Sequence, residues 1–282
     1  MLKLEKIQTI LLDGDGVLWK STDPIPGIQE FIQFLEQNKI QWALLTNNNT
    51  HTVKTYVNKL AGFGIQIDPA RIFTSSTVTA EHIKKKYGPG APIYVVGMNG
   101  LLDTLAEAGL TVFTGETPPP TEVVAVAAGM DREITHEKIK IAMRLILNGA
   151  EFIATNTDGS FPTPEGLNPG TGMVIGAIQA TTGVKPTVIG KPKEAIFLSA
   201  LQFFNTLPES TLMVGDRLET DILGALRLGI QTAAVLSGVT SRAQIAQSNI
   251  KPDLVYEDIA DLHLDMQKRL ADSKNAPASS SI

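Results

Sequence analysis

The sequence contains no cysteine among its 282 residues. This absence excludes disulfide bonds, thiolate catalysis and metal sites built on cysteine. It suits a reducing compartment, so a cytoplasmic location is expected. Long hydrophobic runs are also missing. No stretch approaches the ~20 apolar residues that a spanning helix needs, and the first apolar run is too short for a signal peptide. We therefore expect no membrane partner.

Basic residues do not outnumber acidic ones. The chain has 24 Lys and Arg against 29 Asp and Glu, which gives a formal net charge of −5. Proteins that bind nucleic acid usually present a basic face to the phosphate backbone, so no nucleic-acid partner is expected. The four histidines are scattered. There is no second histidine for a zinc-protease motif after His136 and no G-x-S-x-G segment, which argues against two common classes of hydrolase.

What the chain does contain is typical of an α/β protein. Its length favours about two domains. An apolar share of 43%, with 24 Gly and 16 Pro, suits a compact α/β fold. Short apolar runs alternate with segments of helical periodicity, and this pattern indicates a parallel sheet with crossover helices.

Four of the expected strands end beside a polar residue. They span residues 7–12, 42–45, 187–189 and 212–214 and lead to Asp13, Thr46, Lys191 and Asp216. Ligands of open α/β sheets bind beyond the carboxyl ends of the strands, so these four residues are expected to converge on one site.

The middle of the chain reads as a second α/β unit. Its expected strands span residues 93–96, 123–127 and 152–154, and its expected helices span 101–106 and 139–147. Core-type segments lie on both sides. We therefore predict a core in two parts, residues 1–81 and 185–270, an inserted α/β cap domain at 82–184, and a flexible tail at 271–282.

The segment Asp13-Gly14-Asp15-Gly16 is the most informative one. It is not a dinucleotide-binding fingerprint, because the third glycine position is Trp19, and it lacks the ligands of an EF-hand loop. An ordinary Asp/Gly turn is the simplest alternative. Otherwise it places two carboxylates at the mouth of a sheet, where one can attack or bind metal while the other transfers protons.

The remaining polar segments each have a chemical and an ordinary interpretation. Thr46 to Asn49 could cradle phosphate or simply cap a helix. Gly190-Lys191-Pro192 offers a cation but is no Walker A motif. The acidic run from Asp216 to Asp221 could favour a helix N-terminus. If Asp13 and Asp216 lay ~4 Å apart, their repulsion would be about 4 kcal/mol at an effective dielectric near 20. A divalent cation would offset it, and oxygen-only ligation points to Mg²⁺.

In this order, the four segments resemble the four motifs of the haloacid-dehalogenase superfamily. The closer match is to its branch with p-nitrophenyl phosphatase, phosphoglycolate phosphatase and pyridoxal phosphate phosphatase. The resemblance rests on residues 13–19, 46–48, 190–192 and 215–221, and in the insert on residues 154–158 and 169–172. It implies a Rossmann-like, doubly wound parallel-sheet core with an inserted α/β cap.

By the same resemblance, Asp13 would be the nucleophile and an Mg²⁺ ligand. Asp15 would protonate the leaving alcohol and then deprotonate the attacking water, and its backbone carbonyl would also bind the ion. Asp216 would complete the protein ligands. Asp221 would hydrogen-bond a water held by the metal.

The resemblance also assigns the substrate contacts. Thr46, the Asn47 backbone and Lys191 would hold the phosphoryl group, and the cap residues Asn156 and Asp158 would face the substrate. The partner implied is a small-molecule phosphate ester, and a homodimer through the cap is expected.

The function expected is Mg²⁺-dependent hydrolysis of small phosphate monoesters, such as p-nitrophenyl phosphate or phosphoglycolate, through an aspartyl phosphate. One alternative is a phosphotransferase or phosphomutase that uses the same intermediate. Another is a receiver-like regulatory module, against which the cap and Asp15 argue. A catalytically silent binding protein is the third.

Overall fold

The structure is a computed structural model that describes residues 4–163 and 165–275. The described residues form two compact units. The first unit contains the chain up to Leu44, Gly62–Ile65 and the part from Ala200 onward, and the second unit contains Leu45–Ala61 and Gln66–Ser199. No helix in these two described ranges is both long enough and apolar enough to cross a membrane.

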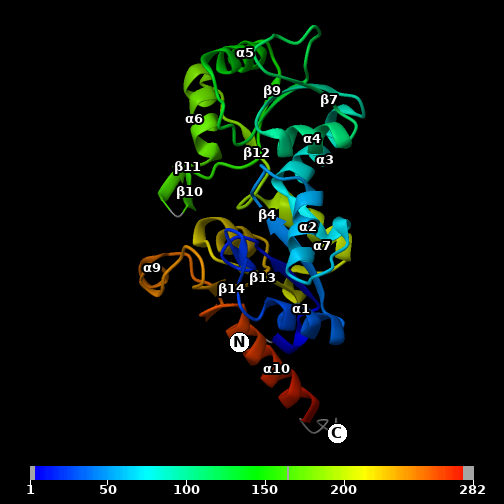
Figure 1. Ribbon diagram of the computed structural model, residues 1–282, viewed down its shortest axis with the longest axis vertical. Coiled ribbons are helices and arrows are strands. Elements are labelled where there is room, and N and C mark those ends of the chain that lie inside the picture. The colour runs from blue at the N-terminus through cyan, green and yellow to red at the C-terminus, as the bar shows by residue number, and fades with distance from the viewer. Residues whose placement is uncertain (1–3, 164, 276–282) are drawn as a thin grey trace. The chain divides into compact units, whose positions relative to one another are not determined.

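The first unit is built around a parallel sheet (Figure 1). Its elements are β1 (Thr9–Leu12), β2 (Trp19–Lys20), β3 (Asp23–Pro24), α1 (Ile28–Gln37), β4 (Gln41–Thr46), β13 (Thr211–Gly215), α8 (Leu223–Arg227), β14 (Gln231–Val235), α9 (Arg242–Gln247), β15 (Leu254–Tyr256) and α10 (Ile259–Asn275). Within this unit the strand order of the sheet is β15-β14-β13-β1-β4, and β2 and β3 form a separate antiparallel pair. The last two residues of β4, Leu45 and Thr46, already belong to the second unit.

The second unit has a parallel sheet of its own, in the order β12-β9-β8-β6-β7, and an antiparallel pair formed by β10 and β11. Its elements are α2 (Val53–Gly62), β5 (Ile72–Thr74), α3 (Ser75–Tyr87), β6 (Pro92–Val96), α4 (Asn99–Glu107), β7 (Thr111–Thr114), β8 (Ala125–Ala128), α5 (His136–Leu147), β9 (Glu151–Ala154), β10 (Ser160–Thr163), β11 (Gly166–Pro169), α6 (Thr171–Thr182), β12 (Thr187–Val188) and α7 (Glu194–Phe204). Helices α5 and α6 pack against each other and against β8.

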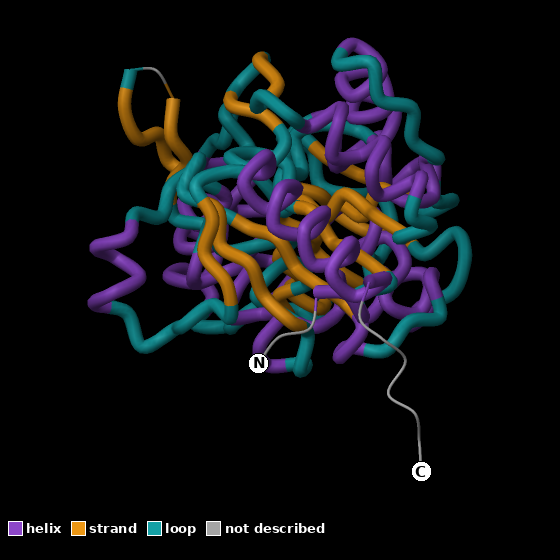
Figure 2. The backbone as a smooth tube through the Cα atoms, turned by 90° about the horizontal axis from the view of Figure 1, so that it is seen from below, coloured by secondary structure: helices purple, strands orange, loops and turns teal. Residues whose placement is uncertain are grey.

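The central strands β1 and β13 are buried along their whole length, and both are mainly apolar after an initial threonine. Burial on both faces is typical of a parallel sheet with helices on its two sides. Figure 2 shows the strands with helices beside them. The predicted α/β class is therefore confirmed.

Helix α1 illustrates how local sequence places an element. Gly27 precedes it with φ of 89°, a backbone conformation that glycine adopts without steric cost. Its apolar residues recur at helical spacing, so Phe31 and Leu35 are buried together, and the helix packs against α10. At its end the Asn38 side chain donates a hydrogen bond of 2.9 Å to the Phe34 carbonyl.

One predicted strand joins the other sheet. Residues 187–189 were expected in the core sheet, but β12 pairs with β9 in the five-stranded sheet. A strand of two residues carries too little pattern to indicate its partner, because strand pairing depends on tertiary context. Of the four strands predicted to lead to a polar site residue, three therefore belong to the first sheet. Two of them precede Asp13 and Asp216, and the third ends at Thr46.

Several elements were not predicted, among them β7, α6 and the β10–β11 pair. The predicted domain boundary at residue 82 falls inside α3, and the boundaries at 82 and 184 stay predictions. The predicted tail from Ala271 lies mostly outside the described residues, but Ala271 to Asn275 still belong to α10.

Candidate active site

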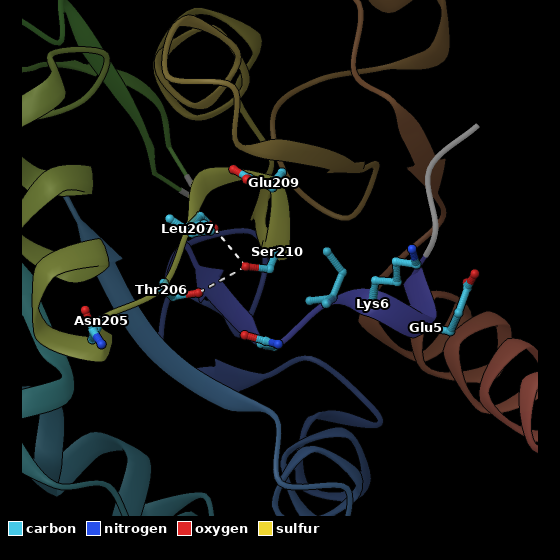
Figure 3. A pocket seen from close by; sticks show the side chains of 9 residues that line it. Glu5, Lys6, Asn205, Thr206, Leu207, Glu209 and Ser210 are labelled. Atoms are coloured by element: carbon cyan, nitrogen blue, oxygen red, sulfur yellow. Dashed lines mark hydrogen bonds between the residues drawn. The ribbon is translucent and has the colours of Figure 1, made fainter.

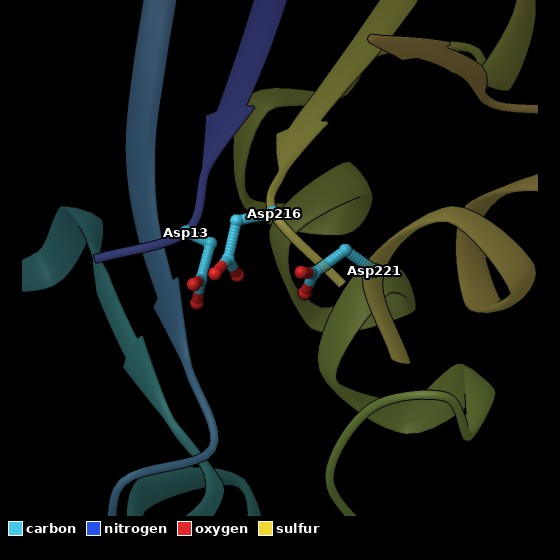
Figure 4. Close-up of side chains that lie close together, drawn as sticks. All are labelled: Asp13, Asp216 and Asp221. Atoms are coloured by element: carbon cyan, nitrogen blue, oxygen red, sulfur yellow. The ribbon is translucent and has the colours of Figure 1, made fainter. Parts of the chain in front are cut away.

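Two of the predicted metal ligands follow neighbouring strands. Asp13 comes directly after β1 and Asp216 directly after β13, and these strands are parallel, with Leu12 paired to Val214. The Asp13 N–H continues the ladder by donating to the Val214 carbonyl at 3.0 Å. The pairing therefore brings the two aspartates side by side at the carboxyl edge of the sheet (Figure 4).

Asp221 joins them from the π-helical turn Leu218–Ile222. Asp13, Asp216 and Asp221 are all buried, and one carboxylate oxygen from each lies within 4.8 Å of the others. Carboxylates at such distances repel one another, by about 4 kcal/mol per pair at ~4 Å and an effective dielectric near 20. The set contains only hard oxygen donors, which is the ligand chemistry of Mg²⁺, Ca²⁺ and Mn²⁺. The three side chains thus fit a hard divalent cation.

Three glycines make room for this cluster. A Cβ atom on Gly16 or Gly238 would lie 2.4 or 2.0 Å from Oδ2 of Asp216, and one on Gly215 would lie 2.2 Å from Cβ of Asp221. Real Cβ atoms do not approach so closely. The backbone therefore encloses the carboxylates at distances that only glycine permits.

Backbone N–H groups also orient the carboxylates. The Val239 N–H donates to Oδ2 of Asp216 at 2.8 Å, and the Arg217 N–H donates to Oδ2 of Asp221 at 3.1 Å. Hydrogen bonds to an ionised acceptor are stronger than those between neutral groups, so these contacts fix the direction of both side chains.

Asp15 does not belong to the group of three buried carboxylates. Its side chain is exposed, and its Oδ1 accepts a hydrogen bond of 2.9 Å from the indole N–H of Trp19. The metal contact predicted for its backbone carbonyl stays a prediction.

The second unit holds the residues predicted to bind phosphate. Lys191 is only 2% exposed, so it is a buried residue and not a solvated surface lysine. Its Nζ donates to the Leu45 carbonyl at 3.1 Å, and its own carbonyl accepts from Nδ2 of Asn47 at 2.9 Å. Thr46 precedes Asn47 at the end of β4 and is buried too, so Thr46, Asn47 and Lys191 are brought together.

The two predicted cap residues contact the same loop. Nδ2 of Asn156 donates to the Asn47 carbonyl at 2.7 Å. Both carboxylate oxygens of Asp158 accept from Nδ2 of Asn47, at 3.2 and 3.4 Å. The Ser75 hydroxyl donates to the Asn47 carbonyl at 2.8 Å. The loop after β9 and the loop after β4 are therefore hydrogen-bonded to each other within the second unit.

Sequence reasoning missed the role of Asn49. Its Nδ2 donates to the hydroxyls of Thr155 and Thr171, at 3.0 and 3.2 Å, and its Oδ1 accepts from the Met130 N–H at 2.9 Å. The run of three asparagines after β4 indicates polar contacts at this position, but it does not indicate which residues Asn49 contacts.

A separate hollow of about 600 Å³ lies at the other end of the first sheet (Figure 3). Its lining comes from the segment before β1, including Glu5 and Lys6, and from the segment before β13, including Thr206 and Ser210. It contains none of the predicted site residues, because those follow the carboxyl ends of the strands.

Two family models match this chain. One, described as haloacid dehalogenase-like hydrolase, matches residues 10–111, and the other, described as HAD-hydrolase-like, matches residues 188–262. An acid sugar phosphatase from Staphylococcus aureus (strain USA300) is 34% identical over 265 residues, which cover 94% of this chain and 100% of that protein.

Solved structures of two phosphatases are similar over nearly the whole chain. The p-nitrophenyl phosphatase from Archaeoglobus fulgidus has 31% identity and a TM-score of 0.86, covering 92% of this chain and 99% of its own. The 4-nitrophenylphosphatase from Thermotoga maritima has 31% identity and a TM-score of 0.86, and the match covers 94% of this chain and 99% of that chain.

The chain belongs to the haloacid-dehalogenase-like hydrolase family. Its fold is the Rossmann-like parallel core with an α/β cap that the motifs implied. Within the family it is a phosphatase, that is, a phosphoric monoester hydrolase.

Proposed function

We propose that this phosphatase depends on Mg²⁺ and hydrolyses small phosphate monoesters through an aspartyl phosphate on Asp13. The observation that carries the proposal is the buried cluster of Asp13, Asp216 and Asp221 at the end of the parallel sheet. Uncatalysed phosphate-monoester hydrolysis is exceptionally slow, and splitting it into two transfers replaces one difficult step by two easier ones.

In the first half of the reaction, a carboxylate oxygen of Asp13 attacks phosphorus. The new oxygen–phosphorus bond forms while the bond from phosphorus to the ester oxygen breaks. Asp15, protonated on one carboxyl oxygen, gives this proton to the departing alkoxide, and the alcohol leaves.

In the second half, water attacks phosphorus from the opposite side and Asp15, now ionised, takes its proton. The bond between phosphorus and Asp13 breaks, which releases inorganic phosphate and restores both side chains. One water is consumed for each ester, and Asp15 ends the cycle protonated as it began.

The carboxylates of Asp13 and Asp216 and the backbone carbonyl of Asp15 would hold the Mg²⁺ ion, beside Asp221. When bound, the ion supplies positive charge that offsets the repulsion among the carboxylates and the negative charge of the phosphoryl group. The oxygen-only donor set supports this ion over softer metals.

Thr46, the Asn47 backbone and Lys191 would hold the phosphoryl oxygens in line for attack. Phosphoryl transfer depends mainly on positioning and charge neutralisation, and Lys191 is suited to both because the Leu45 carbonyl fixes its direction. The loop of Asn156 and Asp158 would lie toward the leaving group. The names of the relatives favour sugar phosphates and p-nitrophenyl phosphate as substrates to test first.

Two experiments test this proposal. Exhaustive chelation should abolish phosphate release, and Mg²⁺ should restore it better than Zn²⁺. Asp13→Asn should lower kcat by roughly 10⁴-fold or more, as loss of a nucleophile does. Asp103→Asn, an exposed carboxylate on α4, is the matched control and should keep full activity. Undiminished turnover after chelation, or by Asp13→Asn, would contradict the mechanism.

A further inference from the structure

The loop that carries Asp15 closes on itself through Trp19. The N–H groups of Leu18 and Trp19 both donate to the Gly14 carbonyl, at 2.9 and 3.1 Å, and the Gly16 N–H donates to the Trp19 carbonyl at 2.7 Å. The indole packs tightly against Gly14, since a Cβ atom there would be 2.4 Å from Cζ2 of the ring. Trp19 therefore sits against the backbone between Asp13 and Asp15.

The burial of the two partners differs. Trp19 is 1% exposed, whereas the Asp15 side chain is exposed. An exposed carboxylate ordinarily samples several rotamers, but here a buried donor holds Oδ1 at 2.9 Å. Because the packed ring cannot move freely, the direction of the Asp15 carboxyl group is set by the core of the first unit.

We propose that Trp19 is a positioning residue that acts through Asp15 in proton transfer to the leaving group. This inference rests on the proposed acid role of Asp15. When Asp15 is protonated, Oδ1 keeps the carbonyl character that accepts the indole N–H, so the proton is carried on Oδ2. The indole thereby selects the oxygen that donates to the ester oxygen. Trp19 itself needs no contact with substrate.

A merely structural role for Trp19 makes a different prediction. A packing defect lowers turnover of all esters together, whereas misdirected proton transfer harms only esters whose leaving group needs a proton. The parameter kcat/KM reports the steps up to formation of the aspartyl phosphate, which is where the leaving group departs. We therefore compare p-nitrophenyl phosphate, whose leaving group needs little protonation, with a simple alkyl phosphate.

Trp19→Phe keeps an aromatic ring and removes the donor. We expect kcat/KM for the alkyl phosphate to fall about tenfold more than for p-nitrophenyl phosphate, an effect of ~1.4 kcal/mol. In the Asp15→Asn background, Trp19→Phe should cause no further extra fall in kcat/KM for the alkyl phosphate, because Trp19 acts only through Asp15. Equal losses for both esters, or a selective loss that persists without Asp15, would overturn the proposal.

Trp42→Phe is the matched control. Trp42 is the other tryptophan of the chain, it is equally buried in the first unit, and its indole N–H has no hydrogen-bond partner within the described residues. It should leave the ratio of the two kcat/KM values unchanged. If Trp19→Phe fails to fold, Trp19 is replaced by 3-benzothienylalanine in the Trp42→Phe protein, which removes the indole N–H and keeps a ring of similar shape. The expected result is again a larger fall in kcat/KM for the alkyl phosphate, and equal losses for both esters would again overturn the proposal.

The Asp15→Asn variant distinguishes a failure of the acid role of Asp15 from a failure of the positioning role of Trp19. If Asp15→Asn alone lowers kcat/KM no more for the alkyl phosphate than for p-nitrophenyl phosphate, the acid role of Asp15 is wrong, and the role of Trp19 is wrong with it. If Asp15→Asn shows that loss while Trp19→Phe does not, only the positioning role is wrong.

Discussion

The acidic cluster depends on main-chain atoms as much as on the aspartates. Oδ2 of Asp216 receives the Val239 N–H, and Gly16 and Gly238 pass so close to this carboxylate that a side chain on either would collide with it. The geometry of a metal ligand is therefore fixed by residues that offer no ligand atom. Such neighbours commonly tune metal affinity.

Gly238→Ala should weaken metal binding. The added methyl group must displace the Asp216 carboxylate or the Val239 N–H, and a hydrogen bond to a charged group is worth about 1.5–3 kcal/mol. We expect the Mg²⁺ concentration for half-maximal activity to rise roughly tenfold to a hundredfold, measured by titrating Mg²⁺ into metal-free protein.

Gly176→Ala provides the control for this substitution. Gly176 lies inside α6, and an added Cβ there would meet nothing within 4 Å. Its Mg²⁺ titration should match that of the unchanged protein. A Gly238→Ala protein with the same titration as the control would show that Gly238 does not set the position of Asp216.

Among the elements, the loops after β4 and β9 form one hydrogen-bonded assembly. Asn47 lies at the centre of this assembly. Its backbone carbonyl accepts hydrogen bonds from the side chains of Asn156 and Ser75. Its side-chain Nδ2 donates to the Asp158 carboxylate and to the Lys191 carbonyl. A substitution in the loop after β9 should therefore shift the residues that are proposed to hold phosphate.

Asp158→Ala tests this coupling. The two oxygens of Asp158 lie 3.2 and 3.4 Å from Nδ2 of Asn47. Because these bonds are long, we expect a loss at the lower end for a charged hydrogen bond, about tenfold in kcat/KM. The loss should be common to all substrates in a panel of sugar, alkyl and aryl phosphates.

The neighbouring variant Thr157→Ala, which removes an exposed side chain from the same loop, should leave the panel unchanged. If Asp158→Ala instead changed the order of preference among the substrates, Asp158 would contact the leaving group, and a purely positional role would be wrong.

The strand ends at Asp13, Thr46 and Asp216 were predictable because each follows a short apolar run, a local signal. The sheet that β12 joins was not, since two residues carry no pairing pattern. The contact of Asn49 with Met130 joins residues 81 positions apart, and that of Asp216 with Val239 joins residues 23 apart. Such contacts depend on tertiary packing, which a single sequence does not display.

For the whole molecule, the family models match residues 10–111 and 188–262, and the acid sugar phosphatase from Staphylococcus aureus matches 94% of the chain. The first of these matches extends past the predicted domain boundary at residue 82, so this boundary stays a prediction. The homodimer through the cap stays a prediction.

The covalent role of Asp13 is the central claim, and the Asp15→Asn variant with p-nitrophenyl phosphate tests it most directly. This ester needs little leaving-group protonation, so phosphorylation of Asp13 should proceed, whereas hydrolysis of the intermediate should be slow without the base. We predict a burst of p-nitrophenolate close to one per protein, followed by slow turnover. Borohydride reduction during the burst should convert Asp13 to homoserine, detected by peptide mass spectrometry. A burst with the modification on another residue, or turnover that is linear from the first cycle with Asp13 unmodified, would contradict the account.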